Sequence, residues 1–408
     1  MRRGFSTPIR GQSGREGSET DRRWSAHEDL RRPRAVLRLR RLRPPGPVRL
    51  HPGGRPRRRH TRPGARRRRP AGARGGRRVS VRRDHHRPHG SGRGPGLSTR
   101  GEPGAVAEAL VGLATRYVRN GPGTLGKAAL ATRWLNAHLR EHPRRAVVEL
   151  PSGGRFAVDT QDLIQRYLYL FGAWEPHLTG WLRRRLRPGD GFVDVGANIG
   201  VFSVLAARLV GEAGRVVAIE ASADVHRRLV GNARLNGLRN IRALNAAVSD
   251  RTRTLTFALA SSRNTGANSI VPYDGPVESS FRTEARPLPE LLDTAEIATV
   301  RVIKIDVEGA EGSVVRGLAP MLGALRPDAE IAVEVAPERM ARLGDRVDDL
   351  LAVMRDAGFH GYRLPNDYAP GSYPPALSGA PRAPVRLHGP VTGESDLVFS
   401  RVDAERLP

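Results

Sequence analysis

Two glycines that bracket a tight turn are the residues of this chain with the clearest chemical meaning. The segment Phe192-Val-Asp-Val-Gly-Ala-Asn-Ile-Gly200 begins as a buried-strand pattern, passes through an aspartate, and leads into an apolar helix pattern over residues 201–210. Because Gly196 and Gly200 carry no Cβ atom, a nucleoside can lie directly against the backbone there. The N–H groups at the start of the helix point at the same place. The turn therefore predicts a site for a nucleotide-like cofactor.

The spacing of this turn indicates which cofactor it binds. A dinucleotide site needs G-x-G-x-x-G, whereas this turn reads G-x-x-x-G and Asp194 stands two residues before it. The Asp194 carboxylate would repel a pyrophosphate, but it would hold the ammonium group of S-adenosylmethionine or order a water that does so. The next strand pattern ends in Glu220, twenty residues after Gly200, where a carboxylate can accept both ribose hydroxyls. The residues that we expect to contact the cofactor are Asp194, Gly196, Asn198, Gly200 and Glu220.

Four separated segments give the chain a family resemblance. They are Gly172-Ala-Trp-Glu-Pro176, Asp194-Val-Gly-Ala-Asn-Ile-Gly200, Ile303-Lys-Ile-Asp-Val-Glu-Gly-Ala-Glu311 and Glu394-Ser-Asp-Leu-Val-Phe399. In this order they resemble the FkbM family of S-adenosylmethionine-dependent methyltransferases, over about residues 145–400. The chain departs from the family pattern at Trp174, where tyrosine is usual, and at Ala221, where proline is usual. Residues 264–276 follow no pattern of the family, so the resemblance does not carry over an acceptor.

The resemblance implies an α/β fold with a doubly wound, mainly parallel sheet of seven strands, the Rossmann-like fold of class I methyltransferases. Residues 396–400 would form the antiparallel strand that closes this sheet. The alternation of strand and helix patterns points to the same fold class without the resemblance, because such alternation gives a parallel sheet covered on both faces. After the first central strand, the predicted strands are 215–220, 241–245, 300–306 and 330–335, and the predicted helices are 223–236, 311–318 and 347–357.

The catalytic residues should lie at the carboxyl ends of these strands, where doubly wound sheets open their crevice. In the strand pattern 300–306, Lys304 and Asp306 share one face and Asp306 falls at the strand tip. Methyl transfer to oxygen requires an aligned acceptor and the loss of its hydroxyl proton. We expect Asp306 or Glu308 to act as the base, and Lys304 to hold the developing alkoxide or to tune a neighbouring acid.

Two further acids raise alternatives at this end of the sheet. Glu334 ends the strand pattern 330–335 and should come close to Asp306. Oxygen ligands suit Mg²⁺, so the pair could bind a divalent cation that acidifies the acceptor hydroxyl. Two carboxylates are a small ligand set, however, and we do not favour a metal. Glu311 either belongs to the site or is a favourable acid in the first turn of its helix.

Residues 1–100 differ in composition from the rest of the chain. They hold 31 arginines, no lysine and 6 acidic residues, a net charge of +25 out of +28 for the whole chain. Such a segment cannot bury enough apolar surface to offset its ordering entropy, which predicts disorder. It could bind nucleic acid or anionic lipid through its charge, but it lacks interleaved aromatic residues. We favour a third interpretation, in which GC-rich DNA has been translated outside its natural start or frame.

Residues 101–190 are predicted to form a helical cap with a hairpin, followed by an S-adenosylmethionine-binding domain over residues 191–408. A first helix is indicated by Val106, Leu110, Leu113 and Tyr117, which recur at helical spacing. The hairpin is predicted at 147–158, and further helices at 162–172 and 177–186.

These features favour an S-adenosylmethionine-dependent O-methyltransferase. As the resemblance implies, its acceptor would be a hydroxyl on a small molecule such as a secondary metabolite or a saccharide. A nicotinamide-dependent oxidoreductase is disfavoured by the missing middle glycine. A nucleic-acid-binding protein or RNA methyltransferase, led by the basic segment, is disfavoured because residues 101–408 are nearly neutral. The chain shows no targeting segment or membrane span, so we expect a cytoplasmic location. The absence of cysteine excludes a disulfide scaffold and thiolate metal sites. The oligomeric state is left open.

Overall fold

The computed structural model describes residues 103–259, 270 and 279–408. All of them fall within one compact unit, Leu39–Pro408. The arginine-rich segment, for which we predict disorder, lies outside the described residues. So does the patternless segment 264–276, apart from Ile270.

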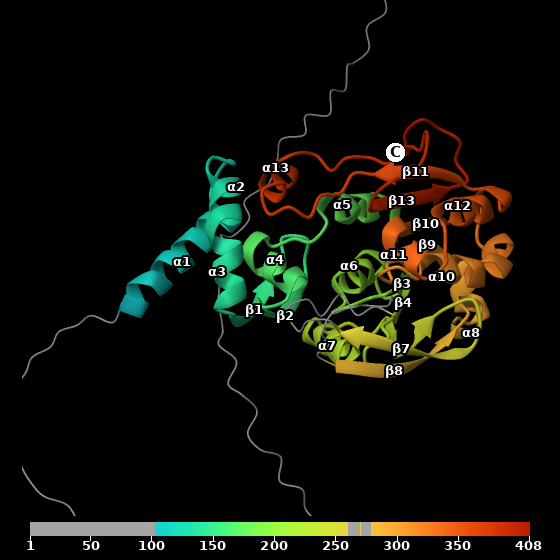
Figure 1. Ribbon diagram of the computed structural model, residues 1–408, viewed down its shortest axis with the longest axis horizontal. Coiled ribbons are helices and arrows are strands. Elements are labelled where there is room, and N and C mark those ends of the chain that lie inside the picture. The colour runs from blue at the N-terminus through green and yellow to red at the C-terminus, as the bar shows by residue number, and fades with distance from the viewer. Residues whose placement is uncertain (1–102, 260–269, 271–278) are drawn as a thin grey trace, which may run out of the picture. The chain divides into compact units, whose positions relative to one another are not determined.

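A parallel sheet forms the centre of the described part of the chain. Its strands are β3 (Gly191–Val195), β4 (Arg215–Ile219), β5 (Ile241–Leu244), β9 (Val300–Ile305), β10 (Glu330–Val335), β11 (His360–Leu364), β12 (Val385–Arg386) and β13 (Ser395–Ser400). They lie in the order β12-β11-β13-β10-β9-β3-β4-β5 (Figure 1). The five strands from β10 to β5 are parallel, and β13 runs antiparallel to both of its neighbours. The predicted fold class is therefore confirmed, with the two-residue strand β12 added at one edge beyond the seven strands expected.

Helices cover both faces of this sheet, because the central strands carry apolar side chains on both sides. Phe192 and Val302 belong to the core on one face, against α5 (Pro176–Arg185) and α6 (Val201–Val210). Val193 and Ile303 point into the core on the other face, against α10 (Glu311–Leu318) and α12 (Val347–Asp356). The remaining elements around the sheet are α7 (Ala223–Leu235), the 3-10 helix η2 (Ala319–Ala324), α11 (Pro337–Arg342) and α13 (Tyr373–Ser378).

The order of strands fixes where a ligand can bind. From β3 the chain proceeds to β4 and β5 on one side, and later to β9 and β10 on the other. In open α/β sheets a crevice forms beyond the carboxyl ends of the strands at such a reversal. The parallel register places Asp194 of β3 beside Lys304 of β9, and Val333 of β10 beside Ile305 of β9. The next residues, Glu334 of β10 and Asp306 just after β9, are therefore neighbours.

The N-terminal part of the described chain packs beside this sheet. Its elements are α1 (Pro103–Asn120), α2 (Lys127–Leu130), the π-helix η1 (Ala131–Leu135), α3 (Asn136–Glu141), β1 (Arg145–Glu149), β2 (Arg155–Asp159) and α4 (Leu163–Phe171). β1 and β2 form the predicted hairpin. α4 begins at Asp162, whose carboxylate accepts a hydrogen bond from the Gln165 N–H at 3.0 Å, and ends at Gly172, whose φ is +72°.

Helix α1 is present as predicted, but its apolar stripe faces outward. Val106, Leu110 and Leu113 are 54–66 % exposed. The buried face instead carries Val111 and Val118. The spacing of apolar residues therefore predicted the helix correctly, but not which face of it packs against the core.

A second, smaller sheet was not predicted. It contains β6 (Ala247–Val248), β7 (Arg253–Leu259) and β8 (Ser279–Arg286) in the order β6-β8-β7, and it is followed by α8 (Leu288–Leu291) and α9 (Thr294–Thr299). Phe257 and Phe281 stack across β7 and β8, with ring centroids 5.0 Å apart. This sheet supplies one wall of the cavity described below.

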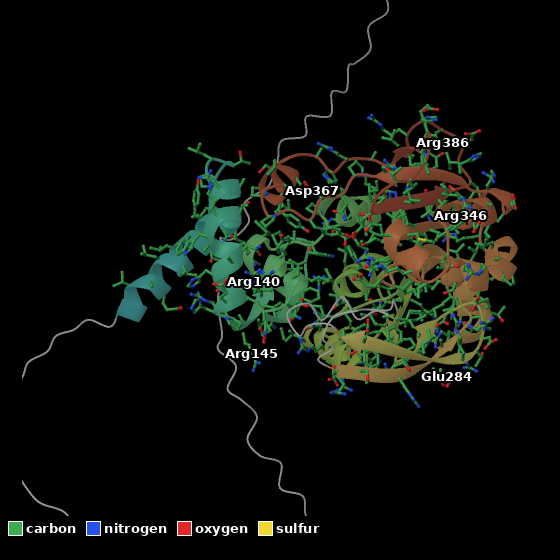
Figure 2. All side chains as sticks on the ribbon, in the orientation of Figure 1. Arg140, Arg145, Glu284, Arg346, Asp367 and Arg386 are labelled. Carbon is green, nitrogen blue, oxygen red and sulfur yellow. The ribbon has the colours of Figure 1, made fainter. Side chains whose placement is uncertain are left out.

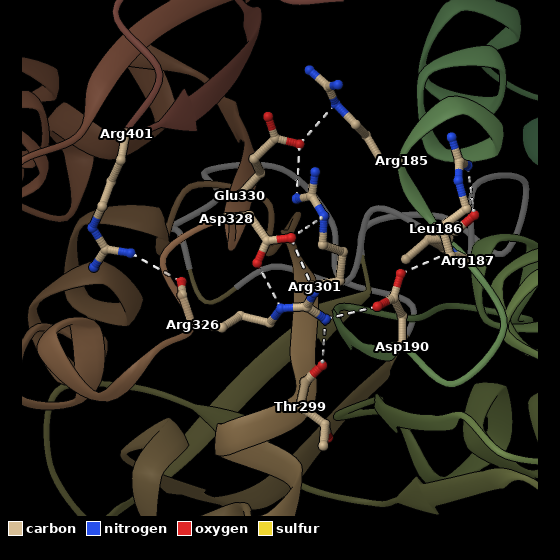
Figure 3. Close-up of polar contacts among 10 residues, drawn as sticks. All are labelled: Arg185, Leu186, Arg187, Asp190, Thr299, Arg301, Arg326, Asp328, Glu330 and Arg401. Atoms are coloured by element: carbon tan, nitrogen blue, oxygen red, sulfur yellow. Dashed lines mark hydrogen bonds and ion pairs between the residues drawn. The ribbon is translucent and has the colours of Figure 1, made fainter.

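A network of ion pairs joins the amino ends of the central strands (Figure 3). Glu330, which begins β10 and is 2 % exposed, lies 2.8 Å from Arg185 and 3.0 Å from Arg301. Asp190, just before β3, lies 2.7 Å from Arg326. These pairs hold the ends of the strands that face away from the crevice, so this network is structural.

Charged side chains elsewhere lie mostly on the outside. Arg145, Glu284 and Arg346 are exposed and project from the surface (Figure 2). Buried acids are unusual against this background, and most of those described below gather at the crevice. Within the described ranges, none of the helices has the length and apolar character needed to cross a membrane.

Candidate functional site

A cavity of about 240 Å³ opens beyond the carboxyl ends of β3, β4, β9 and β10. It contains six of the eight residues predicted for the site, namely Gly196, Asn198, Glu220, Lys304, Asp306 and Glu308. Asp194 and Gly200 do not line it. The apolar part of the wall comes mainly from α4, α6 and the small sheet.

Gly196 is required by the close approach of two strand ends. Its φ is +77°, and a Cβ atom at this position would stand 1.7 Å from the carbonyl oxygen of Asp306. The N–H groups of Gly196 and Ala197 both donate to the carbonyl oxygen of Ile219 at 3.0 Å. The turn is thus tied to β4 on one side and pressed against the end of β9 on the other.

Strained backbone gathers at this cavity. Among the described residues, three other than glycine have positive φ, namely Glu175 at 41°, Asn198 at 50° and Glu308 at 59°. All three line the cavity. Such conformations are costly and persist where the surrounding structure enforces them, commonly at functional sites. This observation marks the cavity independently of any sequence pattern.

Glu220 lies just after β4 and is fixed by the turn after β3. It is 9 % exposed, and its carboxylate accepts hydrogen bonds from the N–H of Asn198 at 2.9 Å and the N–H of Ser222 at 2.8 Å. Burial raises the pKa of Glu220 to about 7. The side chain is therefore held rigidly at the cavity wall.

Asp194 and Gly200 support the site from behind. Asp194 is fully buried, where its carboxylate accepts a hydrogen bond from the Ser203 hydroxyl at 2.6 Å and lies 3.9 Å from the Lys304 ammonium group. Burial raises the pKa of Asp194. Gly200 has a φ of +86° and precedes α6, where a Cβ atom would come within 3.2 Å of Leu229. Asp194 therefore acts on the cavity through Lys304.

Lys304 and Asp306 form an ion pair at the end of β9. The Lys304 Nζ lies 3.0 Å from the Asp306 carboxylate and 5.3 Å from the centre of the Phe202 ring. Burial lowers the pKa of Lys304, but the carboxylates of Asp306 and Asp194 outweigh it and the pKa is raised overall. Lys304 is consequently a permanent cation. It orients Asp306, as the shared face predicted.

Glu308 and Glu311 occupy the turn between β9 and α10. The Glu308 carboxylate lies 2.7 Å from Arg339, and burial raises the pKa of Glu308 to about 8. Glu311 is 1 % exposed and accepts hydrogen bonds from the N–H of Gly309 at 2.9 Å and of Val307 at 3.3 Å. Because Glu311 does not line the cavity, we assign it to holding the turn.

Several charged or polar side chains of the cavity were not predicted as site residues, among them Arg339, Glu175 and Tyr368. Arg339 of α11 faces three carboxylates, those of Glu308 at 2.7 Å, Glu394 at 3.2 Å and Glu334 at 3.6 Å. The other two, Glu175 and Tyr368, reach the cavity from the turn before α5 and the loop after β11. Glu175 lies within one of the four family-like segments, which was a usable signal. No sequence pattern pointed to Arg339 or Tyr368.

A divalent cation between Asp306 and Glu334 was an alternative that the sequence did not favour. Within the described residues, no group of three or more His, Cys, Asp or Glu side chains is placed to hold a metal ion. The pair formed by Asp306 and Glu334 therefore has no third ligand of these kinds in the part of the chain that the structure describes.

The fold and the cavity define an α/β protein with a site for a nucleotide-type cofactor at its strand reversal. Residues 194–360 match the family model of the methyltransferase FkbM domain. This part of the chain is thus similar to the FkbM methyltransferase domain, a family whose cofactor is the predicted one, S-adenosylmethionine.

Solved structures that resemble this chain share little sequence with it. A putative rRNA methylase from Clostridium thermocellum is 11 % identical with a TM-score of 0.35, covering 57 % of this chain and 98 % of its own. TYW2 from M. jannaschii, in complex with AdoMet, is 13 % identical with a TM-score of 0.32, covering 63 % and 87 %. A putative methyltransferase from Streptococcus mutans, in complex with SAH, is 9 % identical with a TM-score of 0.32, covering 56 % and 96 %. A search of curated proteins finds no match.

Proposed function

We propose that this methyltransferase acts on a hydroxyl group of a small molecule. The observation that carries the proposal is that one cavity is lined by the glycine turn, by Glu220 and by the Lys304–Asp306 pair. The first two suit the adenosine part of a cofactor, and the third suits an acceptor hydroxyl. A secondary metabolite or a saccharide is the class of acceptor that we favour.

The residues of the cavity fit S-adenosylmethionine. Glu220 offers buried carboxylate oxygens that can accept from the ribose hydroxyls, and Gly196 lines the same cavity. The glycine makes room for the end of β9, and not for the cofactor as expected from the sequence. Asn198 presents its backbone at the same wall. Asp194 would act on the methionine end through Lys304, or through a water. When bound, the cofactor supplies an electrophilic methyl group on a sulfonium.

The chain's own contribution is alignment and proton removal. Asp306, oriented by Lys304, can accept a hydrogen bond from the acceptor hydroxyl and so aim its oxygen. Glu308 lies at the same rim, and its raised pKa brings it near the value of an effective base at neutral pH. Lys304 can in turn favour the developing negative charge on the acceptor oxygen.

The charge of the cavity supports a small acceptor without phosphate groups. The described part of its wall holds the carboxyl groups of Glu175, Glu220, Asp306, Glu308, Glu334 and Glu394, and two cationic side chains, Lys304 and Arg339. A nucleic-acid backbone brought to this rim would meet an excess of negative charge. RNA methylation is therefore the less favoured function. A cytoplasmic location remains part of the proposal.

Cofactor choice is tested by calorimetry on the full-length protein. We expect heat of binding with S-adenosylmethionine and with S-adenosylhomocysteine, and none with NAD, because the glycine turn lacks the spacing for a pyrophosphate. The acceptor is then sought by incubating the protein with labelled S-adenosylmethionine and a metabolite extract, followed by mass spectrometry. Binding of NAD without binding of S-adenosylhomocysteine would refute the proposal, and transfer of label to RNA would refute its acceptor.

Substitution of Glu220 tests the ribose contact. Glu220→Ala should weaken S-adenosylhomocysteine binding by about 1–3 kcal/mol, because two buried N–H groups lose their acceptor and the ribose hydroxyls lose theirs. The matched control is Glu149→Ala, an exposed glutamate on β1. Unchanged affinity in Glu220→Ala, with the control also unchanged, would remove Glu220 from the cofactor site.

A further inference from the structure

One phenol hydroxyl lies between a buried and a partly buried carboxyl group at the rim of the cavity. The Tyr368 hydroxyl oxygen is 3.2 Å from Oε1 of Glu175 and 3.0 Å from Oε2 of Glu334. All three side chains line the cavity, although they come from distant parts of the chain. We call Glu175, Tyr368 and Glu334 the carboxyl relay.

The two hydrogen bonds of the carboxyl relay need two protons. A neutral tyrosine and two ionised glutamates supply only one. A tyrosine hydroxyl has a single hydrogen, so it can donate to only one of the two carboxylates. If both glutamates were ionised, the other carboxylate would face a phenol lone pair and a like charge in a poorly solvated place. Both contacts are satisfied only when one carboxyl group is protonated, because it then donates to the phenol oxygen while the phenol donates to the other.

Position indicates which glutamate holds the proton. Glu175 is 2 % exposed, and within the described residues it makes no ion pair. Burial raises the pKa of Glu175 well above its ordinary value, and the negative charge of Asp396 raises it further. Burial and the charges of Asp306 and Asp396 also raise the pKa of Glu334. Glu334 lies 3.6 Å from the guanidinium group of Arg339, however, and this cation favours the ionised form of Glu334 over that of Glu175. The direction of the relay is therefore from Glu175 through Tyr368 to Glu334.

Other charged and titratable groups face the relay from several elements. β9 and the turn after it contribute a cation and an anion, α11 a cation and α13 a phenol. One carboxyl group comes from the residue before β13 and another from β13 itself. These groups are Lys304, Asp306, Arg339, Tyr373, Glu394 and Asp396. The surplus of acids explains why a proton is retained here.

We propose that Glu175 is protonated in the resting protein and donates through Tyr368 to Glu334, and that Glu334, in place of Glu308, receives the proton of the acceptor hydroxyl. This role rests on the proposed function. The acceptor exchanges its O–H bond for an O–CH₃ bond, the sulfonium becomes a neutral thioether, and the proton passes to Glu334. The charge summed over the cavity then stays constant through the reaction. Asp306, neutralised by Lys304 at 3.0 Å, aims the hydroxyl.

Two isosteric substitutions separate the two ends of the relay. Glutamine resembles a protonated glutamate because its amide N–H₂ group can donate. Glu175→Gln should therefore keep the donation to Tyr368, whereas Glu334→Gln removes the charged end. Tyr368→Phe interrupts the relay and keeps the ring that stacks on Trp174 at 5.3 Å. Glu149→Gln, on the exposed side of β1, is the matched control.

The pH dependence of stability tests the protonation of Glu175 without any acceptor. A carboxyl group whose pKa is raised in the folded state binds more protons folded than unfolded, so stability is lost as pH rises through the folded value. Between about pH 6 and pH 9, the Tm of the full-length protein should fall more steeply than that of Glu175→Gln, leaving the variant about 2–4 °C higher at the alkaline end. Glu149→Gln should not flatten the profile, and Glu334→Gln should flatten it less than Glu175→Gln does.

Infrared spectra and turnover complete the test. At neutral pH, the carbonyl band of a protonated carboxyl group should be present in the protein, weaker in Glu175→Gln and unchanged in Glu334→Gln. With the acceptor found above, Glu334→Gln should lower turnover by about 10²–10⁴-fold, and Glu175→Gln by far less, with S-adenosylhomocysteine binding unchanged in both. A band lost in Glu334→Gln instead, or a Glu175→Gln stability profile equal to that of the parent, would overturn the relay. If the parent protein does not bind S-adenosylhomocysteine, the proposed function is refuted instead.

Discussion

Asp306→Asn is expected to lower methyl transfer by about 10²–10⁴-fold while leaving S-adenosylhomocysteine affinity nearly unchanged. Asparagine keeps the shape of the side chain and one acceptor oxygen, but it removes the charge that draws the acceptor hydroxyl into line. In this variant the charge of Lys304 is still partly compensated, because the Asp194 carboxylate lies 3.9 Å from its ammonium group. Turnover is measured with labelled S-adenosylmethionine and the acceptor, and affinity by calorimetry.

The control for this substitution is Asp345→Asn. Asp345 is an aspartate of similar burial that pairs with Arg316 at 2.6 Å, and it does not line the cavity. Asp345→Asn should reduce Tm to a similar extent and leave turnover intact. If Asp306→Asn is folded, binds the cofactor and turns over at the parent rate, Asp306 has no part in the reaction and Glu308 becomes the candidate for aiming the hydroxyl.

Gly196→Ala should abolish measurable cofactor binding and lower the free energy of unfolding by about 4 kcal/mol or more. A left-handed conformation alone costs a residue with a Cβ atom about 1–2 kcal/mol. At Gly196 the methyl group would also stand 1.7 Å from the Asp306 carbonyl oxygen, so the ends of β3 and β9 would have to separate. Urea unfolding and calorimetry with S-adenosylhomocysteine measure the two effects.

Gly237 offers a matched control for the conformational part of this effect. Its φ is +67°, close to that of Gly196, but a Cβ atom there would meet nothing within 4 Å. Gly237→Ala should therefore cost only the backbone term and leave cofactor binding intact. Equal losses in the two variants would show that the approach of β3 and β9 is not what requires glycine at 196.

Local patterns were enough to predict the central sheet, and less regular parts escaped for identifiable reasons. β9 and β10 are buried on both faces and read as short apolar runs, so their ends were predicted within one residue. β8 is mostly exposed and carries few apolar residues, which leaves no pattern to detect. In α1 the longest apolar side chains face outward, so periodicity showed the helix but not its contacts.

The same distinction applies to the cavity. Asp306 and Glu220 stand at strand ends, where a short pattern fixes both the element and its tip. Tyr368 lies in an irregular loop, and its position depends on the packing of residues nearly two hundred positions apart, such as its hydrogen bond to Glu175. No local pattern records such a contact. The sequence therefore predicted the cavity residues at strand ends better than those in irregular loops.

The insertion of β13 between β10 and β11 has a consequence for biosynthesis. β10, which carries Glu334 at its end, is paired along its second edge only by residues 395–399. Until the ribosome has released that segment, β10 keeps an open edge that can pair with a strand of another chain. The side of the cavity that Glu334 lines is consequently completed last, and a nascent chain halted before residue 395 would expose an edge of β10 that favours aggregation.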